Sequence, residues 1–88
     1  MPAVQRKDDQ NSAKAAITGG FSSVRVNNKP ISINGSDVAN HGKKPHDAPK
    51  TANGVTSVRA GNTPINVTGN ADTCGDKRIG GSPDVRAG

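Results

Sequence analysis

The chain has 88 residues, enough for one small domain spanning residues 1–88, and its mean hydropathy is -0.70. It has no leucine and a single aromatic residue, so its core is small, and domains of this kind usually rely on a metal, disulfides or a partner. Cys74 is the only cysteine, which excludes an internal disulfide. The net charge of +5 suggests nucleic acid as a partner, but a single aromatic side chain excludes a stacking platform for single strands.

No apolar run is long enough for a signal peptide or a membrane span. We therefore expect synthesis in the cytoplasm, and any export by a route that does not read an N-terminal signal. All seven acidic residues are aspartates, which favour turns and caps over helix interiors, so the composition is typical of a loop-rich β protein. The scattered Lys and Arg residues favour a solvated basic surface.

The first segment with any helical character is "DQNSAKAA", residues 9–16. Asn11 or Ser12 would cap one or two helical turns there, and a loop is the equally weighted alternative. No other stretch favours a helix.

The first predicted hairpin surrounds a turn at residues 27–28, both asparagine. Val24 and Val26 alternate with polar residues before the turn, and Ile31 and Ile33 alternate after it. Because Asn tolerates the positive φ of such turns, this period-two spacing predicts a half-buried β-hairpin.

A polar connector, residues 43–54, leads to a second predicted hairpin with the same pattern around a Gly-Asn turn at residues 61–62. Its alternating apolar residues are Val58, Ala60, Ile65 and Val67. The segment "NGVTSVRAGNTPINVTGNAD" thus repeats "GGFSSVRVNNKPISINGSDV", and the match is too long for chance.

A third copy opens at Gly81, where "GSPDVRAG" matches "GVTSVRAG" of the second copy. The rest of that hairpin is predicted to come from the other end of the chain, because "PAVQRKDD", residues 2–9, aligns with "PISINGSD", residues 30–37. We expect strand 83–88 to pair with strand 2–6, which gives three pseudo-threefold hairpins with protected edges.

The candidate metal ligands lie in the loops that follow the second strands. His41 and His46 lie after the first hairpin and Cys74 after the second. Equivalent loops around a threefold axis converge at one end, and imidazole and thiolate are suitable zinc ligands, of which a structural site takes four. The loop after residue 9 has neither His nor Cys, so the fourth ligand stays open.

Candidates for that fourth ligand are Asp8, Asp9, Asp47 or water. Two solvated histidines and a buried cysteine are the alternative to a metal site. A Cys74–His41 nucleophile pair would also need an orienting group and an oxyanion site, and nothing in the sequence marks either, so we expect no enzyme.

Arg25, Arg59 and Arg86 occupy one repeated position. They form a ring of cations at the base of the domain that faces a partner, or they are three outward-facing strand residues. The sequence leaves both interpretations open.

The opening "MPAVQRKDD" resembles the motif that names the PAAR-repeat proteins, with matches at Pro2, Ala3, Arg6 and Asp9. The segments "VRVNNKPISINGSD" and "VRAGNTPINVTGNAD" look like that family's internal repeats, and "GGSPDVRAG" looks like its closing strand. The resemblance covers nearly the whole chain.

PAAR proteins are conical β domains that cap the trimeric β-helical spike of contractile phage tails and type VI secretion systems, and they typically bind zinc near the apex through three His and one Cys. The resemblance implies that His41, His46 and Cys74 bind zinc, or iron, and that the ring of arginines faces the spike.

We therefore expect an all-β, small conical domain of three hairpins with a metal at its apex. Its predicted role is structural: it caps the spike, one tip per trimer, and sharpens it for piercing, with transient contact to the target cell envelope. It would reside in a virion tail or be secreted with the injection apparatus, and the sequence leaves that choice open. Nucleic acid and small-molecule substrates are not expected. The alternative is a basic β-repeat binding module for an acidic polymer or nucleic acid, with salt-sensitive binding.

Overall fold

The computed structural model describes residues 2–40, 42 and 49–87. These residues form an all-β fold that contains no helix and consists of two two-stranded antiparallel sheets linked by isolated β-bridges. The segment at residues 9–16 is accordingly a loop. Within the described ranges, no helix reaches the length and hydropathy needed to cross a bilayer.

The two sheets are the two predicted hairpins. The first pairs β1 (Phe21–Val26) with β2 (Lys29–Ile31), and the second pairs β3 (Val55–Ala60) with β4 (Thr63–Ile65). Both turns have positive φ at both central residues, between 53° and 66°, which is the geometry that Asn and Gly favour in two-residue hairpins.

The strands depart from the predicted alternation before each turn. A bulge shifts the register between Phe21 and Arg25, and the same shift recurs between Val55 and Arg59. Because a bulge turns the following side chains relative to the sheet, Val24 does not join the core as its spacing predicted and is 37 % exposed.

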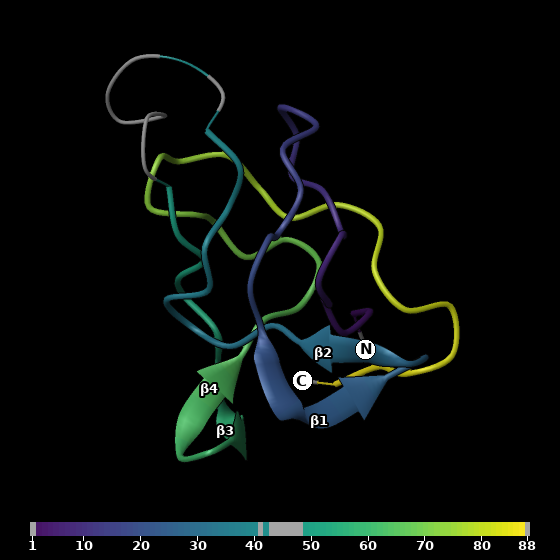
Figure 1. Cartoon of the computed structure of the whole chain (residues 1–88). Coiled ribbons are helices and arrows are strands. Elements are labelled where there is room, and N and C mark those ends of the chain that lie inside the picture. The colour runs from purple at the N-terminus through teal and green to yellow at the C-terminus, as the bar shows by residue number, and fades with distance from the viewer. Residues whose placement is uncertain (1, 41, 43–48, 88) are drawn as a thin grey trace.

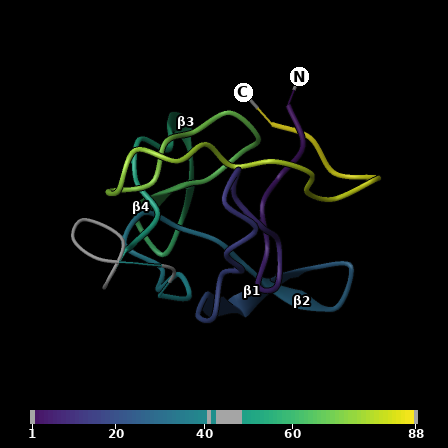
Figure 2. The ribbon, with the colours of Figure 1, turned by 90° about the horizontal axis from the view of Figure 1, so that it is seen from above.

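The predicted pairing of the two chain ends is present as a single β-bridge between Ala3 and Arg86. Val4 N donates to Val85 O at 2.9 Å, and Ala87 N donates to Pro2 O at 3.0 Å. Figure 2 shows the two ends of the chain side by side. The third pairing is therefore shorter than the two hairpins that a turn connects.

A ring of backbone hydrogen bonds joins the three second strands. Ser32 N donates to Gln5 O, Asn66 N to Ser32 O and Gln5 N to Asn66 O, at 2.9–3.0 Å. All three residues are fully buried. The same backbone contact is thus made three times and closes into a ring. This is a pseudo-threefold arrangement within a single chain.

The ring corrects the alignment of the third copy by one residue. Ala3 lies opposite Arg86 as Pro30 lies opposite Arg25 and Pro64 opposite Arg59. The sequence comparison aligns residue 2 with residue 30 because both are proline. The backbone pairing shows instead that residue 3 is equivalent to residue 30.

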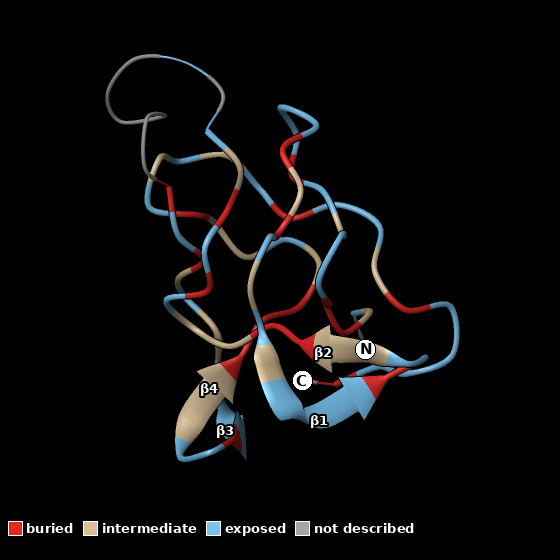
Figure 3. Ribbon diagram, viewed as in Figure 1, coloured by how far each residue is buried: buried red, intermediate tan, exposed pale blue. Residues whose placement is uncertain are grey.

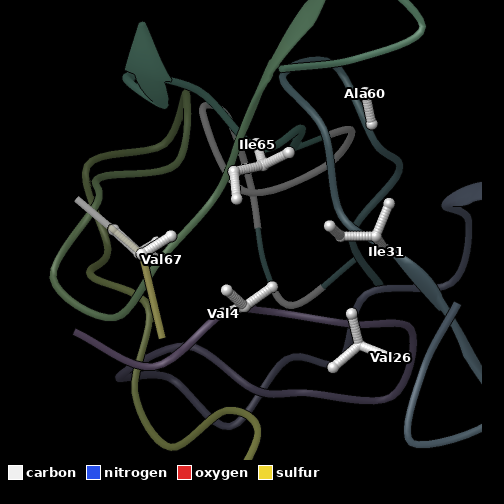
Figure 4. Packing of buried hydrophobic residues seen from close by; sticks show 7 residues of the cluster. Val4, Val26, Ile31, Ala60, Ile65 and Val67 are labelled. Atoms are coloured by element: carbon white, nitrogen blue, oxygen red, sulfur yellow. The ribbon is translucent and has the colours of Figure 1, made fainter. Parts of the chain in front are cut away.

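The hydrophobic core follows the same symmetry (Figure 4). One set of core residues lies at the ends of the first strands: Val26, Ala60 and Ala87. The other set lies in the second strands: Val4, Ile31 and Ile65, with Val67 beside them. Figure 3 shows that β1 is exposed over most of its length and buried at its end. The core is therefore thin, and one face of each hairpin is left to solvent.

Candidate functional site

The hairpins and the connecting loops lie at opposite ends of the domain (Figure 1). Each loop is closed at its neck by an antiparallel bridge, at Gln10–Ala16, Asp37–Lys50 and Ala71–Lys77. Neighbouring loops are joined by three equivalent backbone bonds of 2.8–2.9 Å, Ser12 N to Lys77 O, Ala39 N to Ala16 O and Thr73 N to Lys50 O. Within the described residues, the three loops are therefore joined to one another at their necks, and the convergence of their tips stays a prediction.

Of the three predicted metal ligands, the described residues include only Cys74; His41 and His46 lie outside them. Cys74 is half-buried, and its Sγ lies 3.4 Å from Asp76 Oδ2. Burial raises the pKa of this thiol, and the nearby carboxylates of Asp76 and Asp72 raise it further. Without a cation beside it the sulfur stays protonated, while a bound metal would favour the thiolate.

Ala13 takes the place in the first loop that Cys74 takes in the third. The inter-loop bonds align Ser12 with Thr73, so the next residues, Ala13 and Cys74, are equivalent. The first loop thus presents a methyl group where the third presents a thiol.

The position of Asp9 narrows the choice of the fourth metal ligand. Both carboxylate oxygens of Asp9 accept hydrogen bonds from Arg6, so Asp9 is a poor candidate for that ligand. Asp8 is exposed, and Asp47 lies outside the described residues. Among the described residues, no group of three or more His, Cys, Asp or Glu side chains is placed to hold a metal ion. The metal site therefore stays a prediction.

At the hairpin end, the three predicted arginines lie at equivalent, exposed strand positions. Arg25 Nη1 donates to Asn28 O at 3.1 Å, and Arg59 Nη1 donates to Asn62 O at 3.0 Å. Each of these two arginines therefore supports its own hairpin turn, and Arg59 Nε also donates to Thr56 O at 3.2 Å.

Valine precedes arginine in every copy, and the sequence had not marked these valines as surface residues. Val24, Val58 and Val85 are 37 %, 36 % and 39 % exposed. A bulge turns Val24 and Val58 away from the core, and this could not be seen from alternation alone. The hairpin end thus repeats an apolar side chain beside a cation three times.

Arg6 is a further residue whose role the sequence did not reveal. Its Nε and Nη2 each donate to the Asp9 carboxylate at 2.9 Å, and its Nη1 donates to Asn27 Oδ1 at 3.1 Å. Asn27 Oδ1 also accepts from Ser82 Oγ at 2.6 Å. The hydrogen bond with Asp9 raises the pKa of the Arg6 guanidinium above its ordinary value. Arg6 therefore ties the N-terminal strand to the first hairpin, beside the C-terminal strand.

No protein-family model matches this chain, and no curated protein matches its sequence. Its function must therefore be argued from its residues and their arrangement.

Proposed function

We propose that this protein is a PAAR-repeat spike tip, a structural protein that caps the trimeric β-helical spike of a contractile injection machine. The observation that carries the proposal is the threefold repetition of an exposed valine beside an exposed arginine, on the two hairpins and at the bridge that joins the chain ends. A partner with three identical subunits presents every surface group three times. A single chain matches such a partner only if its own surface repeats three times.

The proposal gives the two ends of the domain different roles. The hairpins form the base of a cone that rests on the spike, and the three connecting loops form its apex. One tip binds one trimer, and the apex touches the target envelope transiently. The protein travels with its apparatus, in a virion tail or with a secretion system.

The donor groups of the loops suit zinc, or iron, as the staple of the apex. In this proposal His41, His46 and Cys74 hold the metal, and Asp8, Asp47 or water completes the shell, because Asp9 is bonded to Arg6. A structural zinc site contributes about 10–16 kcal/mol to a small fold. The small core of this chain makes such a staple useful, and the half-buried Cys74 supplies one thiolate when the metal binds.

Mixing the purified chain with its spike protein tests the capping role. We expect one tip per trimer by light scattering after size exclusion, and loss of that complex when Val24, Val58 and Val85 are all replaced by Asp. Ile79→Asp is the matched control, because Ile79 is 44 % exposed but lies outside the three hairpins. A triple variant that binds like the native chain, or a native chain that elutes apart from the spike, refutes the proposal. Salt-sensitive binding to DNA instead would favour the basic binding module.

A further inference from the structure

A buried ion pair lies between the first and third connecting loops. Arg78 Nη2 and Asp72 Oδ2 are 2.9 Å apart, and both side chains are fully shielded from solvent. Burial lowers the pKa of Arg78, and the charge of Asp72 opposes that effect. An ion pair without access to water is costly to assemble, so its partners and geometry are tightly specified.

The pair reaches across to the first loop through directional bonds. Asn11 Nδ2 donates to the same Asp72 Oδ2 at 3.0 Å. Arg78 donates to Asp9 O from Nη1 and to Ala15 O from Nη2, both at 3.3 Å. The ion pair thus contacts the first loop at both ends, at residues 9 and 15.

Asn11 also organises the loop internally. Its Oδ1 accepts from Ala13 N at 2.9 Å and from Ala15 N at 3.0 Å. One side chain therefore shapes the first loop and links it to Asp72.

The contact between the first and second loops is built differently. There Ile17 pairs with Val38, and both are buried in a small apolar cluster with Ala15. Repeat equivalence places Val38 where Asn11 and Asp72 stand and Ile17 where Arg78 stands, so the Ile17–Val38 bridge corresponds to the Asn11–Arg78 bridge. One loop contact is therefore apolar and non-directional, and the other is ionic with fixed geometry.

We propose that the Asp72–Arg78 ion pair, with Asn11, is a protein-only clamp that fixes the first loop against the third. The clamp works without metal. It holds the first loop, which has Ala13 at the position where the third loop has the thiol of Cys74. This device goes beyond the proposed spike-tip role and does not depend on it.

Hydrogen exchange of the Ser12 amide tests the clamp, because this amide donates to Lys77 O across the two loops and touches none of the three clamp side chains. The variant is Asp72→Val with Arg78→Ile, which gives each partner the apolar residue at a repeat-equivalent position, Val38 and Ile17. We expect the melting temperature to stay within a few degrees and the Ser12 amide to exchange about tenfold faster or more, since local opening sets that rate. EDTA treatment of the native protein should change the Ser12 rate by less than about twofold.

Two further variants keep the test decisive. Gln10→Ala changes an exposed residue of the same loop and should leave the rate unchanged. If the double variant does not fold, Asn11→Ala keeps the ion pair and the two bonds from Arg78 to the first loop, removes the Asn11 link to Asp72, and should also speed Ser12 exchange. The clamp is refuted if these changes leave Ser12 protected, or if EDTA alone releases it.

Discussion

Arg6→Val is the substitution that most sharply tests how the chain ends are held. The positions equivalent to Arg6 are Ile33 and Val67, both apolar, so a valine fits the space. The side chains of Arg6 and Asp9 are only 11 % and 10 % exposed. Removing the guanidinium leaves Asp9 with the backbone N–H of residue 6, at 2.7 Å, and without its two 2.9 Å side-chain bonds.

Breaking a buried pair by removing one partner costs about 3–5 kcal/mol, and the remaining exposure of this pair lowers our expectation to about 2–4 kcal/mol. A domain of this size loses about 4–8 °C in melting temperature per kcal/mol, so we expect a decrease of about 8–32 °C.

The second repeat supplies a compensating change. There Asn70 Oδ1 accepts from Val67 N at 2.8 Å, so Arg6→Val with Asp9→Asn copies a pair that the fold already uses. We expect the double variant to regain most of the lost stability, because no unpaired carboxylate stays buried.

Thermal unfolding, monitored by circular dichroism, measures the stability of the native protein and of the two variants. Arg25→Met, at an exposed position, is the control and should lower the free energy of unfolding by about 0.5 kcal/mol or less. The reasoning fails if Arg6→Val costs less than about 1 kcal/mol, or if the double variant is no more stable than the single one.

Three more outcomes are expected. At Gly81, where φ is 111°, an added Cβ would lie 2.9 Å from the Cβ of Ala3, whereas at Gly75 it would meet nothing. Gly81→Ala should therefore lower the free energy of unfolding by about 1–3 kcal/mol more than Gly75→Ala. Equal losses in denaturant titrations would contradict this. Ala13→His should strengthen zinc binding about tenfold or more in chelator competition, because it adds a ligand at the place equivalent to Cys74; an unchanged affinity, as expected for Ala13→Ser, would count against converging loops. Cys74→Ser should lower the melting temperature of the zinc-loaded protein and not that of the EDTA-treated protein, and equal melting curves with zinc would exclude the thiolate as a ligand.

The hairpins were predictable because their signals are local. Period-two alternation and the Asn-Asn and Gly-Asn turns define β1–β4, and the repeated "VRAG" indicated the closure by strand 83–88. The register of that closure was off by one residue, because a shared proline is weaker information than the backbone pairing of Ala3 with Arg86.

The buried polar groups were not predictable from the sequence. Arg6, Asn11 and Arg78 look like ordinary surface residues, and their burial depends on partners that only the fold brings near; Asn11 and Asp72, for example, are 61 positions apart. The exposed valines were missed for a different reason, since a bulge reverses the face that alternation assigns. The loops are joined at their necks, while the convergence of their tips and the metal that they would hold stay predictions.

The pairing of the two chain ends also orders the events of biosynthesis. Residues 2–6 are made early in this domain, and their long-range backbone partners lie at residue 32 and at residues 66, 68, 82, 85 and 87. Pairing over such a separation is slow, because a long loop must close before any contact forms. The segment therefore keeps part of its edge unpaired until residues 82–87 have been made, and exposed strand edges of this kind invite pairing with other chains. The first strand of this domain is completed only when its last strand arrives.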